Sequence, residues 1–242
     1  MLLHRMTWPD VEAYLKTSRG LIVPIGSTEQ HGPNGPIGTD VICPEQVAHG
    51  VGEADGVLIA PAIPFGMAQH HLAFPGTMSL KPATLLLVLK DLIGSLERHG
   101  FERIYFLNGH GGNIATVTAA FSEIYAERAA SAPRLKLVNW FMGVRVRKLS
   151  RDLYGESEGS HATPSEVSLA WRAWPETARQ VEMSPKVAPK GVIRDAEDYR
   201  RQFPDGRIGS DPSLSSVEHG ERLYAAAVED VRESYAEFLR EA

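Results

Sequence analysis

The sequence is poor in cysteine, with Cys43 alone among 242 residues, so no disulfide can form within the chain. A single thiol fits the reducing cytoplasm, where we expect the protein to reside. Cys43 lies in the stretch Asp-Val-Ile-Cys-Pro. This setting favours a small buried residue over a nucleophile, because free cysteine is among the most frequently buried residue types.

Long apolar runs and a surplus of positive charge are also missing. No run reaches membrane-spanning length, and residues 1–8 lack the apolar core of a signal peptide. The chain has 25 Lys and Arg against 30 Asp and Glu, which gives a net charge of -5. A mildly acidic chain has no basic surplus to bind nucleic acid. We therefore expect neither a membrane nor a nucleic acid as partner.

Length and composition are those of an ordinary globular protein, with 43% hydrophobic and 23% charged residues. We find no internal repeat and no domain boundary, and we therefore expect one domain over residues 1–242.

Short apolar runs alternate with helical patterns along the chain. This alternation predicts a layered α/β fold with right-handed crossovers around a mostly parallel sheet. Pro24 lies inside the first run and predicts an edge position or an early end for that strand. The expected strands are 21–25, 57–60, 103–107 and 135–140. The expected helices are 7–16, 44–51, 82–99, 113–130, 163–174 and 217–239, and the expected long loops are 143–161 and 183–216.

Four side chains of metal-ligand type occur in or near two glycine-rich turns. Glu29 and His31 follow the first predicted strand, Asp40 comes nine residues after His31, and His110 follows a later strand. The carboxyl ends of parallel strands meet at one edge of a sheet, so we expect these groups to converge there. Glu, Asp and His are ligands of Zn, Mn and Fe in hydrolytic sites, and Asp40 could bridge two ions.

Other interpretations of these residues remain open on spacing alone. Asp40 could simply cap the helix that begins near Pro44, and His110 could be a turn histidine bonded to backbone. The segment 108–113 could cradle a phosphate at a helix N-terminus, although it lacks a Walker lysine and the full dinucleotide pattern.

Glycine and asparagine surround His110. Gly109, Gly111 and Gly112 permit tight turns and close approach of backbone to a ligand. Asn108 and Asn113 are suited to fixing the turn, and Asn113 could cap the helix that follows.

Glu166 and His161 are further candidates. Thr163, Pro164 and Glu166 form a capping box, which explains Glu166 structurally, but a helix start facing the crevice could also present it to an ion. His161 is a candidate proton shuttle, because histidine titrates near neutral pH. His71 is expected to line the same pocket.

Taken together, these motifs resemble the creatininase (creatinine amidohydrolase) family. The first is Gly-Ser-Thr-Glu-Gln-His-Gly at 26–32, the second is the segment 71–77 and the third is Asn-Gly-His-Gly-Gly-Asn at 108–113, and together these three are highly specific. Other matching segments are 39–40, 161 with 166–168, and 209–212 with 218–220, so the resemblance covers nearly the whole chain in order.

The resemblance implies a fold, an assembly and a chemistry. Its fold is a three-layer α/β/α sandwich with a mainly parallel central sheet, usually assembled as a hexamer. Its members bind two divalent ions, variously Zn, Mn or Fe, and hydrolyse C–N bonds of cyclic or formyl amides. By resemblance Glu29 and His110 would hold one ion, His31 the other, and Asp40 both.

The chain departs from creatininase itself directly after the motif histidine. That enzyme has an aromatic residue and then a metal-binding glutamate, where this chain has Gly111 and Gly112. We hypothesise that Glu166 or water completes the second metal site, and we do not expect creatinine as substrate. The Gly-Gly pair after the motif histidine is similar to the sequence at this place in the formamidopyrimidine deformylases and the mycofactocin-maturing peptidases of the family.

These observations predict a dinuclear metal-dependent amidohydrolase that attacks a small amide with a metal-activated water. His161 or Glu166 would pass the proton to the leaving nitrogen. One alternative is a deformylase of a formamidopyrimidine nucleotide, which needs cations near the pocket, and another is a mycofactocin-maturation-like peptidase. A non-enzymatic metal-binding protein is a third. The basic cluster that could bind a nucleotide consists of Arg145, Arg147, Lys148 and Arg151. We favour the interpretation that these residues belong to a solvated loop, because charged runs usually lie on the surface.

Overall fold

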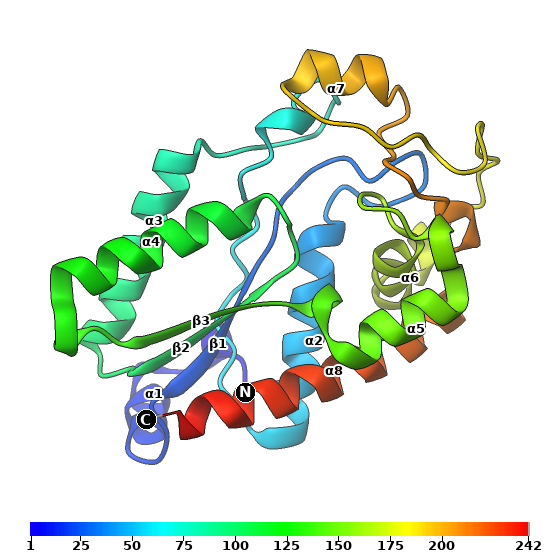
Figure 1. Cartoon of the computed structure of the whole chain (residues 1–242). Helices are drawn as coiled ribbons and strands as arrows, with labels where there is room; N and C mark the ends of the chain where they lie inside the picture. Colours follow the sequence, from blue (N-terminus) through cyan, green and yellow to red (C-terminus); the bar gives the residue numbers. More distant parts are fainter. Residues whose placement is uncertain (242) are drawn as a thin grey trace.

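A computed structural model describes residues 1–241, and it shows a small sheet with helices packed on both faces (Figure 1). The strands are β1 (Gly20–Ile25), β2 (Arg103–Asn108) and β3 (Arg134–Asn139), in the order β1-β2-β3 and all parallel. Ile25 is in register with Asn108, and Asn108 with Asn139. The three strands therefore end at the same level, and the turns after β1 and β2 begin side by side.

Eight α-helices lie within residues 1–241. They are α1 (Trp8–Leu15), α2 (Thr39–Asp55), α3 (Pro82–Arg98), α4 (Asn113–Arg128), α5 (Val144–Tyr154), α6 (Pro164–Ala173), α7 (Ala196–Gln202) and α8 (Val217–Arg240). No helix within residues 1–241 has both the length and the apolar character needed to span a membrane.

Alternate residues of the strands pack into two separate hydrophobic cores, one on each face of the sheet. Ile22 and Tyr105 point into a core shared with α2, α5, α6 and α8. Leu21 and Ile104 point into a second core, shared with α3 and α4. Both faces of the sheet are thus covered, as period-2 alternation in a buried parallel sheet requires. The three-layer α/β/α prediction is confirmed.

The expected strand at 57–60 was wrong as a regular strand. This segment contacts β1 only through isolated bridges, such as Ile22 with Ile59, and a further bridge joins Ile25 to Ile63. Pro61 and Pro64 follow the segment and cannot donate ladder hydrogen bonds, so the pairing does not propagate. Strand β1 is terminal in the three-stranded order, but its outer side is not a free edge, since Ile22 and Pro24 share backbone hydrogen bonds with residues 58–63.

One loop prediction and one helix prediction need correction. Residues 143–161 are not a long loop, because α5 spans Val144–Tyr154. Its buried positions, Val146, Ser150 and Tyr154, are four residues apart, but the dense charge between them hid this pattern. Helix α2 begins at Thr39, not near Pro44, so Asp40 lies inside its first turn.

The expected loop at 183–216 is largely irregular, as predicted, although it includes α7 and a short 3-10 helix at Pro212–Leu214. The predicted limits of the other helices agree with α1, α3, α4, α6 and α8 to within two residues.

Candidate metal centre

The four predicted ligand residues meet at the carboxyl end of the sheet. Glu29 and His31 lie in the segment after β1, Asp40 is in the first turn of α2, and His110 follows β2. All four are buried, with at most 5% of any residue exposed. The convergence expected from parallel strands is therefore present in the structure.

The carboxylate of Asp40 lies between two imidazoles. Its Oδ1 is 3.1 Å from Nε2 of His31, and its Oδ2 is 2.9 Å from Nδ1 of His110. On the other side of His110, Nε2 is 3.3 Å from Oε2 of Glu29. Asp40 thus connects a residue of the first turn to a residue of the second.

Three groups of side chains could each hold a metal ion. In each group one ligand atom per residue lies within 4.8 Å of the others. The groups are Glu29, Asp40 and His110; His31, Asp40 and Glu166; and Glu29, His31 and His161. The first two groups share Asp40, which is the arrangement expected for a carboxylate common to two ions.

The buried oxygens of this cluster fit a cation. Both carboxylate oxygens of Glu29 and Oδ2 of Asp40 are buried, and imidazole nitrogens of His71 and His110 lie 2.9–3.3 Å from them. Buried ionised carboxylates are costly unless a charge of opposite sign offsets them. The donor set of imidazoles and carboxylates therefore fits a divalent ion such as Zn or Mn.

Protonation of the metal-free cluster follows the same logic. Burial disfavours a charge on His31, but the carboxylates of Asp40, Glu166 and Glu29 together outweigh burial and raise the pKa of His31 to about 10. Burial is likewise outweighed at His110, where Glu29 and Asp40 raise the pKa to about 9. The pKa of Asp40 lies below its usual value because the imidazoles of His31 and His110 overcome the effect of burial. Protons thus occupy the imidazoles that metal ions would need.

Glu166 caps its helix and also faces the cluster. Its Oε1 accepts a hydrogen bond of 2.6 Å from the N–H of Thr163, and its own N–H donates to Oγ1 of Thr163 at 3.2 Å. The capping box is therefore confirmed. The same Oε1 lies 3.9 Å from Nε2 of His31. The geometry permits both roles at once, and burial raises the pKa of Glu166 above its usual value.

Gln30 organises the histidines behind Glu29, and the sequence reasoning missed it. Its Nε2 is 2.9 Å from Nδ1 of His71 and 2.9 Å from Nε2 of His161, and it donates to the carbonyl of Gly206 at 2.9 Å. Gln30 is not a metal-ligand type, but its place between Glu29 and His31 in an extended segment puts it on the opposite side. The alternation of side chains along this segment was the sequence signal that could have drawn attention to Gln30.

His71 and His161 both approach Glu29. Nε2 of His71 is 3.1 Å and Nδ1 of His161 is 3.8 Å from Oε1 of Glu29. His71 is buried behind Glu29 and is not among the residues that line the cavity, so the expectation that it does was wrong. Burial lowers the pKa of both imidazoles, to about 2 for His71, so both are neutral at physiological pH.

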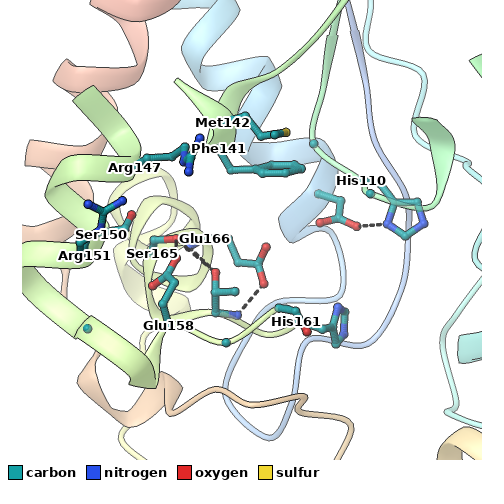
Figure 2. A pocket seen from close by; sticks show the side chains of 17 residues that line it. His110, Phe141, Met142, Arg147, Ser150, Arg151, Glu158, His161, Ser165 and Glu166 are labelled. Carbon is teal, nitrogen blue, oxygen red and sulfur yellow. Dashed lines mark hydrogen bonds and ion pairs between the residues drawn. The ribbon is translucent and has the colours of Figure 1, made fainter. Parts of the chain in front are cut away.

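A cavity of about 580 Å³ opens beside the cluster. His110 and His161 lie on one side of it, and the side chains of α5 lie on the other (Figure 2). Asp40 and Glu166 also line it. The volume is within the range of small-molecule sites.

Two glycines allow the backbone of Asp40 to approach both turns. A Cβ on Gly26 would lie 2.1 Å from the carbonyl oxygen of Asp40, and a Cβ on Gly109 would lie 2.0 Å from the same atom. Pro44, four residues after Asp40, has no N–H to donate to this carbonyl. Any side chain at either glycine would push Asp40 away from the histidines.

Gly111 and Gly112 differ in their surroundings. A Cβ on Gly112 would lie 2.3 Å from Nε2 of His110 and 2.6 Å from the carbonyl oxygen of Met67, whereas a Cβ on Gly111 would meet nothing within 4 Å. A side chain at 112 would therefore clash with His110 and with the backbone of Met67 unless one of them moved. Glu166 contributes the carboxylate that completes the group around His31 and Asp40.

The asparagines fix the turn around His110, but one prediction about them was wrong. Asn108 accepts from the N–H of His110 and donates to its carbonyl, as expected for a turn residue. Asn113 does not cap α4, because the cap position is Gly112. Its side chain instead donates to the carbonyl of Gly26 and accepts from the N–H of Met67, and so ties the two turns together.

The chain is similar to known proteins over most of its length. A family model described as creatinine amidohydrolase matches residues 4–235. The mycofactocin precursor peptide peptidase of Mycolicibacterium smegmatis is 32% identical over 219 residues, which span 86% of this chain and 81% of that protein. The creatinine amidohydrolase of Pseudomonas putida is 28% identical over 96% of this chain and 95% of its own length.

Solved structures show the same likeness. A crystal structure of creatinine amidohydrolase covers 100% of this chain and 98% of its own, with a TM-score of 0.87 and 25% identity. The similar creatininase structures include a Zn-Zn form and a Mn form.

The close approach of Gly109 to Asp40 generates a matched prediction. Gly109→Ala should destabilise the protein by about 1–3 kcal/mol, because the added methyl group overpacks a buried contact. Gly111→Ala adds the same methyl group where nothing lies within 4 Å, and its stability should stay within about 0.5 kcal/mol of the parent. Urea unfolding of the three proteins measures both. Equal stability of the two variants would contradict the packing described.

Proposed function

The chain belongs to the creatininase family of hydrolases, and we propose that it is a dinuclear amidohydrolase cleaving a C–N bond of a small cyclic or formyl amide. The observation that supports this most strongly is the carboxylate of Asp40, which lies within 3.1 Å of both His31 and His110. One ion would be held by Glu29, Asp40 and His110, and the other by His31, Asp40 and Glu166.

The ions, once bound, would supply Lewis acidity that polarises the amide carbonyl and lowers the pKa of a water. Their identity is proposed to be Zn, Mn or Fe, since the ligand set suits each of them. Asp40 and Glu29 would offset their charge in a buried site, and the fixed turns would hold the imidazoles in place without reorganisation.

Proton transfer is assigned to residues at the cavity wall. His161 is neutral because burial and neighbouring imidazoles lower its pKa, so it is ready to accept a proton on Nδ1, the atom that faces Glu29. Its Nε2 lies 2.9 Å from the backbone carbonyl oxygen of Gln30, and donation to that oxygen orients the ring and leaves Nδ1 without a proton. Glu166 is the second candidate, because burial raises its pKa and favours the protonated form that can donate to a leaving nitrogen.

A peptidase is the second candidate function. The support is the 32% identity to a mycofactocin precursor peptide peptidase over most of both chains. A peptide bond is itself an amide, so the same ions and the same proton carriers would serve, and only the lining of the cavity would differ. The cytoplasmic location, the hexamer and the single domain over residues 1–242 stay predictions.

Removal of Asp40 tests the proposed function. Asp40→Ala should reduce bound metal from two ions to at most one per chain. Turnover of cyclic and formyl amides should fall by more than 100-fold, because loss of a residue that orients a ligand already costs about 10–100-fold. Metal analysis and an amide panel measure this. Asp152→Ala, which removes an exposed carboxylate on α5, is the control and should change neither value. Two bound ions with undiminished turnover in Asp40→Ala would refute the proposal.

Glu166 is tested by separating its two roles. Glu166→Gln keeps an oxygen that can accept from the N–H of Thr163 but removes the charge, so it should lose one ion per chain with little change in stability. Thr163→Ala removes the other half of the capping box and should lower stability by about 1 kcal/mol while both ions stay bound. Metal content of both variants is the measurement. Unchanged metal in Glu166→Gln would leave Glu166 with the capping role alone.

A further inference from the structure

We infer that one face of α5 binds an anionic group of the substrate through Arg147, Ser150 and Arg151. This deepens the proposed function, on which it rests, because it names a property of the substrate rather than of the reaction. The anion would be a carboxylate or a phosphate monoester carried at some distance from the amide that is cleaved.

Structure divides the basic cluster of α5 into two pairs. Arg145 is paired with Asp230 at 2.9 Å and with Glu233 at 2.6 Å, both on α8. Lys148 is paired with Asp152 at 2.6 Å on α5 itself. These two cations are therefore already neutralised by neighbouring carboxylates.

Arg147 and Arg151 have no such partners. Neither guanidinium forms an ion pair or a hydrogen bond with residues 1–241, and both residues line the cavity that contains Asp40 and His110. They are four residues apart, so they lie on one face of the helix. If α5 were only a solvated charged helix, there would be no reason for its two unpaired cations to be the two that line the cavity.

Ser150 supplies a second, independent observation. It lies on the same face, lines the cavity, and is 94% buried, since only 6% of the residue is exposed. Its hydroxyl oxygen has no hydrogen-bond partner within residues 1–241. A buried hydroxyl without a partner is costly, and a ligand that accepts its hydrogen bond would remove this cost.

The three side chains lie across the cavity from His110 and His161 (Figure 2). Two guanidinium groups and a hydroxyl match the oxygens of a carboxylate or phosphate, which guanidinium binds in bidentate fashion. The carboxylates in the lining are those of Asp40 and Glu166, at the cluster, and that of Glu158, which accepts a hydrogen bond from the hydroxyl of Ser165. A substrate that spans the cavity would thus place its amide at the metal cluster and its anion at α5.

Equilibrium binding to the metal-loaded protein tests this inference. The probes are phenyl phosphate, benzoate and neutral benzamide. Arg147→Gln with Arg151→Gln should weaken at least one anionic probe by about tenfold or more, since a charge-assisted hydrogen bond contributes roughly 1.5–3 kcal/mol. Benzamide binding should change less than about twofold. A larger loss for phenyl phosphate identifies a phosphate ester as the preferred group, and a larger loss for benzoate identifies a carboxylate.

The matched control is Arg145→Gln with Lys148→Gln. It removes the same charge from the same helix, but from the paired side, so binding of all three probes should stay within about twofold of the parent. Equal losses in the two double variants would show a general effect of charge and overturn the inference. Unchanged anion binding in the Arg147 and Arg151 variant would overturn it too, because the anions would then bind to the metal ions alone.

Failure of this inference can be told apart from failure of the proposed function. If the protein hydrolyses amides but its anion binding does not depend on Arg147 and Arg151, the inference is wrong and the hydrolase proposal stands. If anion binding depends on these arginines but no amide is hydrolysed, the hydrolase proposal is wrong and the anion site stands. Metal content and thermal unfolding of each variant show that the fold and the cluster are intact.

Discussion

The position of Asp40 is the constraint on which the candidate site depends. Its backbone carbonyl fits between Gly26 and Gly109, and its carboxylate joins His31 to His110. The sheet makes this possible, because β1 and β2 end in register and bring their turns to one side of α2. A single residue therefore couples the fold to the chemistry, through its backbone on one side and its side chain on the other.

The glycines after His110 acquire a physical meaning from this arrangement. The backbone at Gly112 passes so close to the ring of His110 that a side chain at 112 would clash with that ring. In its place, the first turn of α6 brings Glu166 towards His31. Helix capping and proposed metal binding converge on one carboxylate, and this explains why the capping box alone did not decide between the two roles.

Much of the site was predictable because it is encoded in short motifs after strands. Glu29, His31, Asp40 and His110 are of ligand type, and parallel strands bring their ends together. Other parts depend on tertiary contacts that local patterns do not carry. The contacts that Gln30 makes depend on where the fold places His71 and His161. The 57–60 run failed as a strand because prolines stop its pairing. The dense charge of α5 hid a helix, of which Arg147 and Arg151 line the cavity.

The central claim is that two ions share Asp40. A crystal structure of the metal-loaded protein, with anomalous data collected at the edge of the bound metal, tests it most directly. The account predicts two anomalous peaks per chain, both coordinated by Asp40, one also by Glu29 and His110 and the other by His31 and Glu166. A single peak, or two peaks of which only one contacts Asp40, would contradict the account.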